Sequence, residues 1–112
     1  MKIYHNPRCS TSRKTLDLLK EKGLEPEVIL YLVNTPTAKE LSAVLNQLGM
    51  TAFDLIRKNE AIYKDNYKDK EHSNKEWIDI LVANPKLIER PIIINNGKAV
   101  IGRPIERVLD II

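Results

Sequence analysis

The chain has 112 residues, of which 29% are charged and 43% are hydrophobic, and its formal net charge is +3 at pH 7. A chain of this length fits one domain that buries roughly two thirds of its unfolded surface, so we expect a single domain spanning residues 1–112. The weak net charge, with both signs interleaved, disfavours a nucleic-acid-binding protein. No apolar run approaches the roughly 20 residues that span a bilayer, and the first residues do not resemble a secretion signal. We therefore expect a cytoplasmic protein without membrane association.

The N-terminal part of the chain predicts a strand, a helix and a second strand. Lys2–Tyr4 favours a short strand, and Ser10–Lys22 carries helix-forming residues with Gly23 as its C-cap. Val28–Tyr31 is a continuous apolar run of the kind found in parallel strands that are buried on both faces. The order is that of a βαβ unit.

The middle of the chain predicts a helical insertion over about residues 37–88. Thr37 and Glu40 form a capping box ahead of apolar residues at helical spacing, and Gly49 ends this helix. A second capping box opens another helix at Ser73. Both helices are strongly indicated by their start signals.

Weaker signals lie between these two helices. Residues 51–58 favour a shorter helix, whereas residues 59–74 mix charged residues with tyrosines and suit a solvated surface segment. Trp77 has apolar neighbours at helical spacing, which favours a place in the core. The single cysteine and the two separated histidines, His5 and His72, do not form a cluster of metal ligands, so we expect no bound metal.

The C-terminal part predicts a β-hairpin and a short helix. Asn95–Gly97 separates two apolar runs, and Asn-Gly supplies the positive φ angles of a tight hairpin turn. Pro104 stands where the first residue of a helix is expected, and the helix runs to Ile112. The whole order predicts a mixed sheet with helices on both faces and an inserted helical segment, which is the thioredoxin-like arrangement of an α/β protein.

Cys9 is the single cysteine and falls between the first predicted strand and the first predicted helix. A thiolate at a helix N-terminus faces unpaired backbone N–H groups, and Arg8, Arg13 and His5 add positive or polar neighbours. An inert, buried cysteine is the more common fate of a lone cysteine, but this polar setting favours a reactive one. A single cysteine forms no internal disulfide, which suits a reducing compartment.

Two motifs are absent from the loop that carries Cys9. Ser12 occupies the position where a C-x-x-C pair would have its second cysteine, so redox turnover requires an external thiol. Thr15, six residues after Cys9, replaces the arginine of a phosphatase-type C-x5-R loop. The sequence therefore disfavours a phosphatase.

Three arginines have more distinctive sequence surroundings than a surface charge usually has: Arg57, Arg90 and Arg103. Arg90 and Arg103 precede prolines at predicted element boundaries. Each alone is most simply a solvated or salt-bridged side chain. Together they suit an oxyanion site, because a thiolate and an anion about 4 Å apart repel by about 4 kcal/mol at an effective dielectric constant near 20. Arginine compensates this repulsion well, since its planar fork makes bidentate contacts to oxyanions and keeps its proton.

These features together resemble the glutaredoxin-coupled arsenate reductase family. The resemblance runs along the whole chain and is carried by four motifs: His5-Asn6-Pro7-x-Cys9-x-Thr11-Ser12-Arg13, Leu55-Ile56-Arg57-Lys58-Asn59, Arg90-Pro91-Ile92 and Arg103-Pro104. It implies a thioredoxin-like fold in which Pro91 is a cis-proline opposite the nucleophile. Only about 5% of X-Pro bonds are cis, so this isomer follows from the resemblance alone.

The resemblance also implies a reaction. Cys9 would attack arsenate, Arg57 and Arg90 would hold its oxygens, and Arg103 would bind the anion and stabilise the thiolate. Glutathione would reduce the adduct, and glutaredoxin would take up the mixed disulfide as arsenite leaves. His5 and Ser12 match residues that tune the ionisation of the cysteine. No bound cofactor is implied, and the small size suggests a monomer.

Alternatives remain open at this point. Arg8 and Ser10 flank Cys9 where established arsenate reductases have small residues, so the pattern resembles the arsenate reductase-like branch of the family. One alternative is another glutathione-dependent thiol oxidoreductase that needs Cys9 but not Arg57. A second is an RNA polymerase-binding regulator of the related Spx type, although Ser12 removes the cysteine pair that its redox sensor would need.

Overall fold

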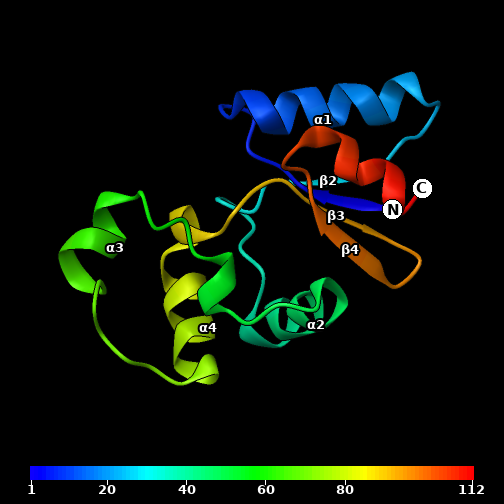
Figure 1. Cartoon of the computed structure of the whole chain (residues 1–112). Helices are drawn as coiled ribbons and strands as arrows, with labels where there is room; N and C mark the ends of the chain where they lie inside the picture. The colour runs from blue at the N-terminus through cyan, green and yellow to red at the C-terminus, as the bar shows by residue number, and fades with distance from the viewer. The chain divides into compact units, whose positions relative to one another are not determined.

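All 112 residues are described in the computed structural model, in which the chain divides into two units. The first unit comprises Met1–Asn34 and Arg90–Ile112, and the second comprises Thr35–Glu89. The segment predicted as a helical insertion, about residues 37–88, falls within the second unit. Both units are drawn in Figure 1.

The first unit contains a four-stranded mixed sheet in the order β2-β1-β3-β4 (Figure 1). Its strands are β1 (Lys2–Tyr4), β2 (Glu27–Ile29), β3 (Ile92–Asn95) and β4 (Lys98–Ile101). β1 pairs parallel with β2 and antiparallel with β3, and β3 pairs antiparallel with β4. This mixed sheet with its packed helices confirms the predicted thioredoxin-like α/β fold.

β2 departs from its prediction. The run Val28–Tyr31 was expected to be buried on both faces, but Val28 and Leu30 are 42% and 39% exposed. The prediction is wrong because β2 is the edge strand of the sheet, with a neighbour on one side only. Tyr31, just beyond the strand, is buried.

The hairpin between β3 and β4 confirms the prediction made from Asn-Gly. Asn95 pairs with Lys98, so the turn has two residues, and these have φ angles of 51° at Asn96 and 77° at Gly97. Positive φ at both positions is the signature of a type I′ turn. This short connection fixes the register of β3, the strand that follows Pro91.

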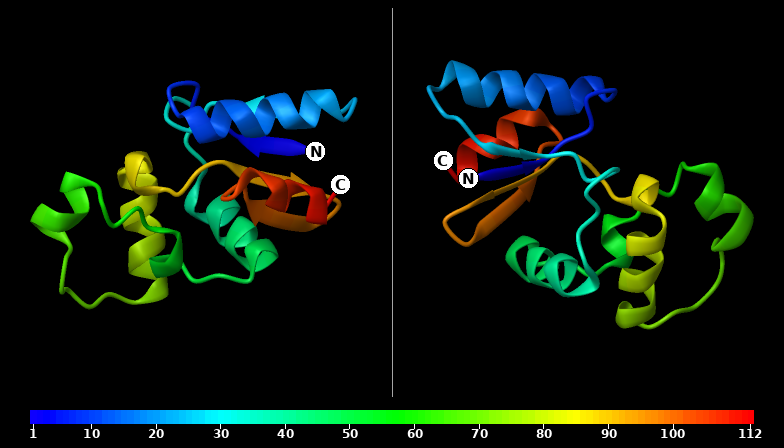
Figure 2. Two further views of the ribbon diagram at one scale, coloured as in Figure 1. Left: turned by 45° about the horizontal axis from the view of Figure 1, so that its top comes forward. Right: turned by 180° about the vertical axis from the view of Figure 1, so that it is seen from behind.

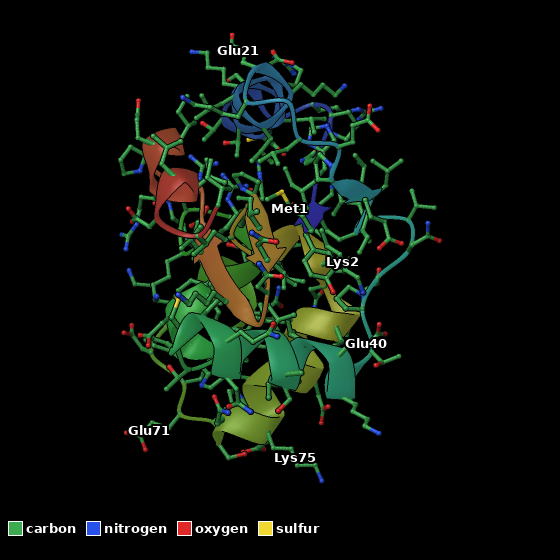
Figure 3. The ribbon with its side chains drawn as sticks, turned by 90° about the vertical axis from the view of Figure 1, so that its right-hand side faces the viewer. Met1, Lys2, Glu21, Glu40, Glu71 and Lys75 are labelled. Carbon is green, nitrogen blue, oxygen red and sulfur yellow. The ribbon has the colours of Figure 1, made fainter.

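One face of the sheet is covered by helix α1 (Ser10–Glu21) and the 3₁₀ helix η3 (Ile105–Asp110), which lie side by side in Figures 1 and 2. The core beneath them is fully buried and consists of Ile3, Leu19, Ile93 and Val108. Glu21, at the C-terminal end of α1, points outward in Figure 3. The helix thus buries one apolar stripe and leaves its charged face in solvent.

The ends of these two helices differ in detail from the prediction. Gly23 has a φ of 76° and donates its N–H to the carbonyl of Lys20, as expected for a glycine that ends a helix. Pro104 precedes η3 as its N-cap, because its ψ of 164° is extended and not helical. The predicted C-terminal α-helix is a six-residue 3₁₀ helix.

Gly102 lies against Pro91 and Thr15 in the first unit. Its N–H donates to the carbonyl of Pro91 at 2.9 Å, and an added Cβ would lie 2.9 Å from both Pro91 Cγ and Thr15 Oγ1. The hydroxyl of Thr15 donates to the carbonyl of Thr11 at 2.8 Å, which fixes its rotamer. There is consequently no room for a side chain at residue 102.

We expect Gly102→Ala to lower the free energy of unfolding by about 1–3 kcal/mol, because the methyl group overpacks this contact. Urea unfolding followed by circular dichroism measures the loss. Adding Thr15→Ala to Gly102→Ala should restore part of the stability, since it removes two of the three crowded atoms. Strictly additive effects of the two substitutions would contradict this explanation.

The second unit is built on α2 (Ala38–Leu48) and α4 (Asn74–Ala83), which pack against each other. Both predicted capping boxes are confirmed. In α2 the backbone N–H of Glu40 donates to the hydroxyl of Thr37 at 3.2 Å, and Gly49 ends the helix with a φ of 68°. The start signals in the sequence therefore set both helices correctly.

Between α2 and α4 the structure differs from the prediction in two segments: residues 51–58 are less helical than predicted, and residues 59–74 are more helical. Residues 51–58 contain only a 3₁₀ turn, η1 (Phe53–Leu55), because Ile56 is extended and forms a β-bridge with Ile88, just after η2 (Pro85–Leu87). The segment treated as solvated contains the short helix α3 (Ala61–Asn66). The long-range bridge to Ile88 has no signature in the local sequence.

Trp77 is 4% exposed, which confirms its predicted place in the core. Around it gather the rings of Phe53, Tyr67 and His72, with centroids 5.5, 6.1 and 4.7 Å from that of Trp77. Glu71 and Lys75, nearby in the sequence, point outward in Figure 3. No helix in either unit is long and apolar enough to cross a membrane.

Candidate active site around Cys9

Cys9 is the N-cap residue of α1, with φ −93° and ψ 121°. Its N–H donates to the carbonyl of Asn6 at 3.0 Å, and its own carbonyl accepts the N–H of Arg13 at 3.0 Å. The thiol is free and 9% exposed. Because no side chain caps α1, the N–H groups of its first turn remain available to a thiolate or an anion.

Arg103 connects Cys9 to the loop before β3. Its Nη2 donates to Sγ of Cys9 at 3.4 Å, and its Nε donates to the carbonyl of Arg90 at 2.7 Å. The second contact anchors the guanidinium group, so that its charge is held beside the sulfur. The contact therefore places a positive charge at the position where an anion would approach Cys9.

Arg90 and Pro91 begin the second segment of the first unit, Arg90–Ile112. The Arg90-Pro91 peptide bond is cis, which confirms what the resemblance implied, and Pro91 is buried. The Arg103-Pro104 bond is also cis. Nε of Arg90 is buried without a hydrogen-bond partner. A buried, unpaired donor of this kind is costly, so it favours a site that an anion would complete.

Arg57 belongs to the second unit. There its Nη1 lies 2.6 Å from Oε1 of Glu60, and its Nε lies 3.6 Å from Oε1 of Glu89. Its backbone N–H donates to the carbonyl of Leu87 at 2.7 Å. The structure thus brings Cys9, Arg90 and Arg103 together in one unit, whereas the predicted role of Arg57 still rests on the family pattern.

His5 and Ser12 form a buried polar pair behind the Cys9 loop. Nδ1 of His5 lies 2.6 Å from Oγ of Ser12, and the same Oγ accepts the N–H of Asn6 at 3.1 Å. Their exposed fractions are 5% for His5 and 0% for Ser12. The pair ties the end of β1 to the first turn of α1 and so holds the loop between them.

Asn6 is a positioning residue that the sequence reasoning did not single out. Its carbonyl accepts the N–H of Cys9, and its Oδ1 accepts the N–H of Arg8 at 3.0 Å. This side-chain turn is a known preference of asparagine before proline, so Asn6-Pro7 carried a usable signal. Arg13 closes the loop from the other side, since its Nη1 donates to the carbonyl of Pro7 at 2.9 Å.

Burial lowers the pKa of His5, and the positive charges of Arg13 and Lys20 lower it further against the opposing charge of Asp17. Protonation of His5 is therefore less favourable in the folded chain than in the unfolded chain, where its pKa is near 6.5. This contribution to stability is fully present above the unfolded pKa and is lost as the pH falls through the folded pKa.

We accordingly expect the wild type to lose more stability than His5→Gln on going from about pH 7.5 to pH 5.5, which brackets the ordinary histidine pKa. Urea midpoints at both pH values measure the difference. Asn46→Gln, an exposed substitution in α2 that changes no titratable group, is the control and should keep the wild-type pH dependence. Identical pH dependence in His5→Gln and the wild type would contradict the effect of burial.

A thioredoxin-like fold with a cysteine at the N-terminus of α1 and a guanidinium group beside it is an arrangement suited to thiol chemistry. The family model described as the ArsC family matches residues 4–111. The chain belongs to this family.

Individual relatives cover nearly the whole chain. It is 54% identical to the uncharacterized protein YfgD of Escherichia coli K12, over 100% of this chain and 96% of YfgD. It is 41% identical to an arsenate reductase of Neisseria meningitidis (serogroup A, strain Z2491), over 96% of this chain and 94% of that protein. The solved structure of an arsenate reductase from Vibrio cholerae matches with a TM-score of 0.95 and 44% identity, covering 99% of this chain and 96% of that one.

Proposed function

We propose that this protein is an arsenate reductase with Cys9 as its nucleophile. The observation that carries the proposal is the contact between Nη2 of Arg103 and Sγ of Cys9, at 3.4 Å, at the open N-terminus of α1. It places a cation beside the sulfur, at the helix end where an anion would bind. Relatives of matching length are named arsenate reductases, which supports the same substrate.

The anion would bind beside the sulfur through arginine side chains. Nε of Arg90 is buried and unpaired, and Arg103 is anchored to the carbonyl of Arg90 at 2.7 Å. Both guanidinium groups would compensate the repulsion between thiolate and oxyanion, which at about 4 Å would otherwise slow the attack by roughly three decades. The family pattern adds Arg57 as a further ligand of the arsenate oxygens.

In the first step the thiolate of Cys9 attacks arsenic and forms a sulfur–arsenic bond. One hydroxyl group of the protonated arsenate takes up a proton and leaves as water, so that arsenic remains in its pentavalent state. The N–H groups at the start of α1 and the guanidinium group of Arg103 stabilise the negative charge on the adduct.

In the second step the thiolate of glutathione attacks the sulfur of Cys9. A mixed disulfide forms, the sulfur–arsenic bond breaks, and arsenic leaves with the electron pair as trivalent arsenite. A thiolate of glutaredoxin then attacks the glutathione sulfur and releases Cys9. External thiols are required because Cys9 is the single cysteine of the chain.

The residues that flank Cys9 do not argue against arsenate. Arg8 and Ser10 are larger than the residues expected in established arsenate reductases, and bulk at these positions was a reason to consider another substrate. Both residues are exposed. Exposed side chains at these two positions are compatible with arsenate as the substrate.

The test is NADPH oxidation by the purified protein in the presence of glutathione, glutaredoxin and glutathione reductase. We expect oxidation to begin on adding arsenate, to saturate with arsenate concentration and to require both glutathione and glutaredoxin. Phosphate at the same concentration is the control and should give no oxidation, because phosphorus is not reduced by thiols. Absence of an arsenate-dependent rate would overturn the proposed function.

A further inference from the structure

A pocket of about 230 Å³ lies along α1 in the first unit. Its lining combines two cations, one carboxylate, a histidine, a hydroxyl and one apolar side chain: Arg13, Lys14, Asp17, His5, Ser10 and Leu16. The reaction described above places no substrate here. We propose that this pocket binds the γ-glutamyl arm of glutathione while its thiol attacks at Cys9. The inference rests on the proposed function and names the binding site of its co-substrate.

The charges of the pocket match this arm. A γ-glutamyl group ends in a free α-carboxylate and a free α-ammonium group on the same carbon. Lys14 supplies a cation and Asp17 a carboxylate, and neither side chain forms an ion pair or a hydrogen bond within the protein. The carboxylate of Asp17 would repel a simple oxyanion, so the pocket suits a zwitterionic end and not a second arsenate.

The dimensions also agree. Ser10 follows Cys9 directly, and Lys14 comes four residues later on the same helix, so these two positions lie roughly 6 Å apart along the axis. The distance from the sulfur of glutathione to the end of its γ-glutamyl arm is about two extended residues, or roughly 7 Å. A molecule with its thiol at Cys9 therefore comes level with Lys14 at its charged end. Asp17 lies roughly 4.5 Å further along the axis, and its side chain, which tilts back toward the helix N-terminus, covers part of that distance.

His5 provides a polar contact at the inner wall of the pocket. The side chain of His5 is only 5% exposed, and its Nδ1 lies 2.6 Å from Oγ of Ser12. Its Nε2 makes no hydrogen bond within the protein. A polar atom on a buried side chain that lines a pocket is the expected partner of a ligand, here the amide of the γ-glutamyl linkage.

The direct test is the binding of S-methylglutathione, which keeps both arms but has no free thiol. We expect titration into the ¹⁵N-labelled protein to shift the backbone amide resonances of residues 10–17. Lys14→Gln should weaken binding by about three- to ten-fold, as expected for a charge contact made by an exposed side chain. Lys22→Gln, beyond the other end of α1, is the matched control and should bind like the wild type.

A second ligand tests the orientation. An analogue of S-methylglutathione that lacks the α-amino group should bind the wild type more weakly than the parent compound, because it loses its contact with Asp17. In Asp17→Asn the two compounds should bind equally. A preference for the amino group that survives in Asp17→Asn would overturn the proposed arrangement, as would shifts confined to residues outside the pocket.

The outcome is separable from that of the arsenate assay. If arsenate gives no turnover but S-methylglutathione binds at residues 10–17 and responds to Lys14→Gln, the pocket assignment stands and the substrate is wrong. If arsenate turnover is normal but Lys14→Gln and Lys22→Gln give the same KM for glutathione and the same affinity for S-methylglutathione, the pocket assignment is wrong and the proposed function stands.

Discussion

Cys9→Ser is expected to remove arsenate-dependent NADPH oxidation, lowering the rate by on the order of 10³-fold or more. A serine hydroxyl does not ionise near neutral pH and is a far weaker nucleophile than a thiolate. The chain holds no second cysteine that could take over the attack. The coupled assay with glutathione, glutaredoxin and glutathione reductase measures the loss.

A control is needed to separate chemistry from folding. Serine differs from cysteine by one atom, and the hydrogen bonds of residue 9 within the loop are made by its backbone. The urea midpoint of Cys9→Ser should therefore stay close to that of the wild type. A variant that is well folded and still reduces arsenate at a substantial rate would show that Cys9 is not the nucleophile.

Arg103→Gln is expected to lower kcat/KM for arsenate by about 10- to 100-fold. A hydrogen bond to a charged group contributes about 1.5–3 kcal/mol, and the exposure of Arg103 to solvent reduces this contribution. The same substitution should slow alkylation of Cys9 by iodoacetamide at neutral pH, because the thiolate loses its cation. Stopped assays of both rates measure the effect.

Arg107→Gln is the matched control, since Arg107 is an exposed arginine in η3. It should leave both rates unchanged. Arg103→Lys should recover part of the alkylation rate, because it restores the charge but not the fork that contacts both Sγ of Cys9 and the carbonyl of Arg90. Alkylation of Arg103→Gln at the wild-type rate would contradict a role for Arg103 in stabilising the thiolate.

The elements that the sequence predicted well have strong local signals. Capping boxes at Thr37 and Ser73 set the starts of α2 and α4, and Asn96-Gly97 set the hairpin. The errors arose where long-range pairing decides the outcome. Val28 was predicted to be buried on both faces of the sheet but lies on the edge strand. Ile56 falls in a segment predicted to be helical but forms a β-bridge with Ile88.

The site was predictable in its residue types but only partly in its geometry. The position of Cys9 before a helix and the family motifs identified Cys9 and the arginines as candidates. The contact between Arg103 and Cys9 joins residues 94 positions apart and has no local signature. The same is true of the packing of Gly102 against Thr15 and Pro91.

The most direct test of the central claim is the intact mass of the protein after anaerobic incubation with glutathione and arsenate, without glutaredoxin. We predict a mass increase equal to one bound glutathione, located at Cys9 by peptide mapping and absent when arsenate is omitted. Arsenate is then the only oxidant, so the mixed disulfide reports the two-electron reduction of arsenic at Cys9. An unmodified protein, or a glutathione adduct that forms equally without arsenate, would contradict the account.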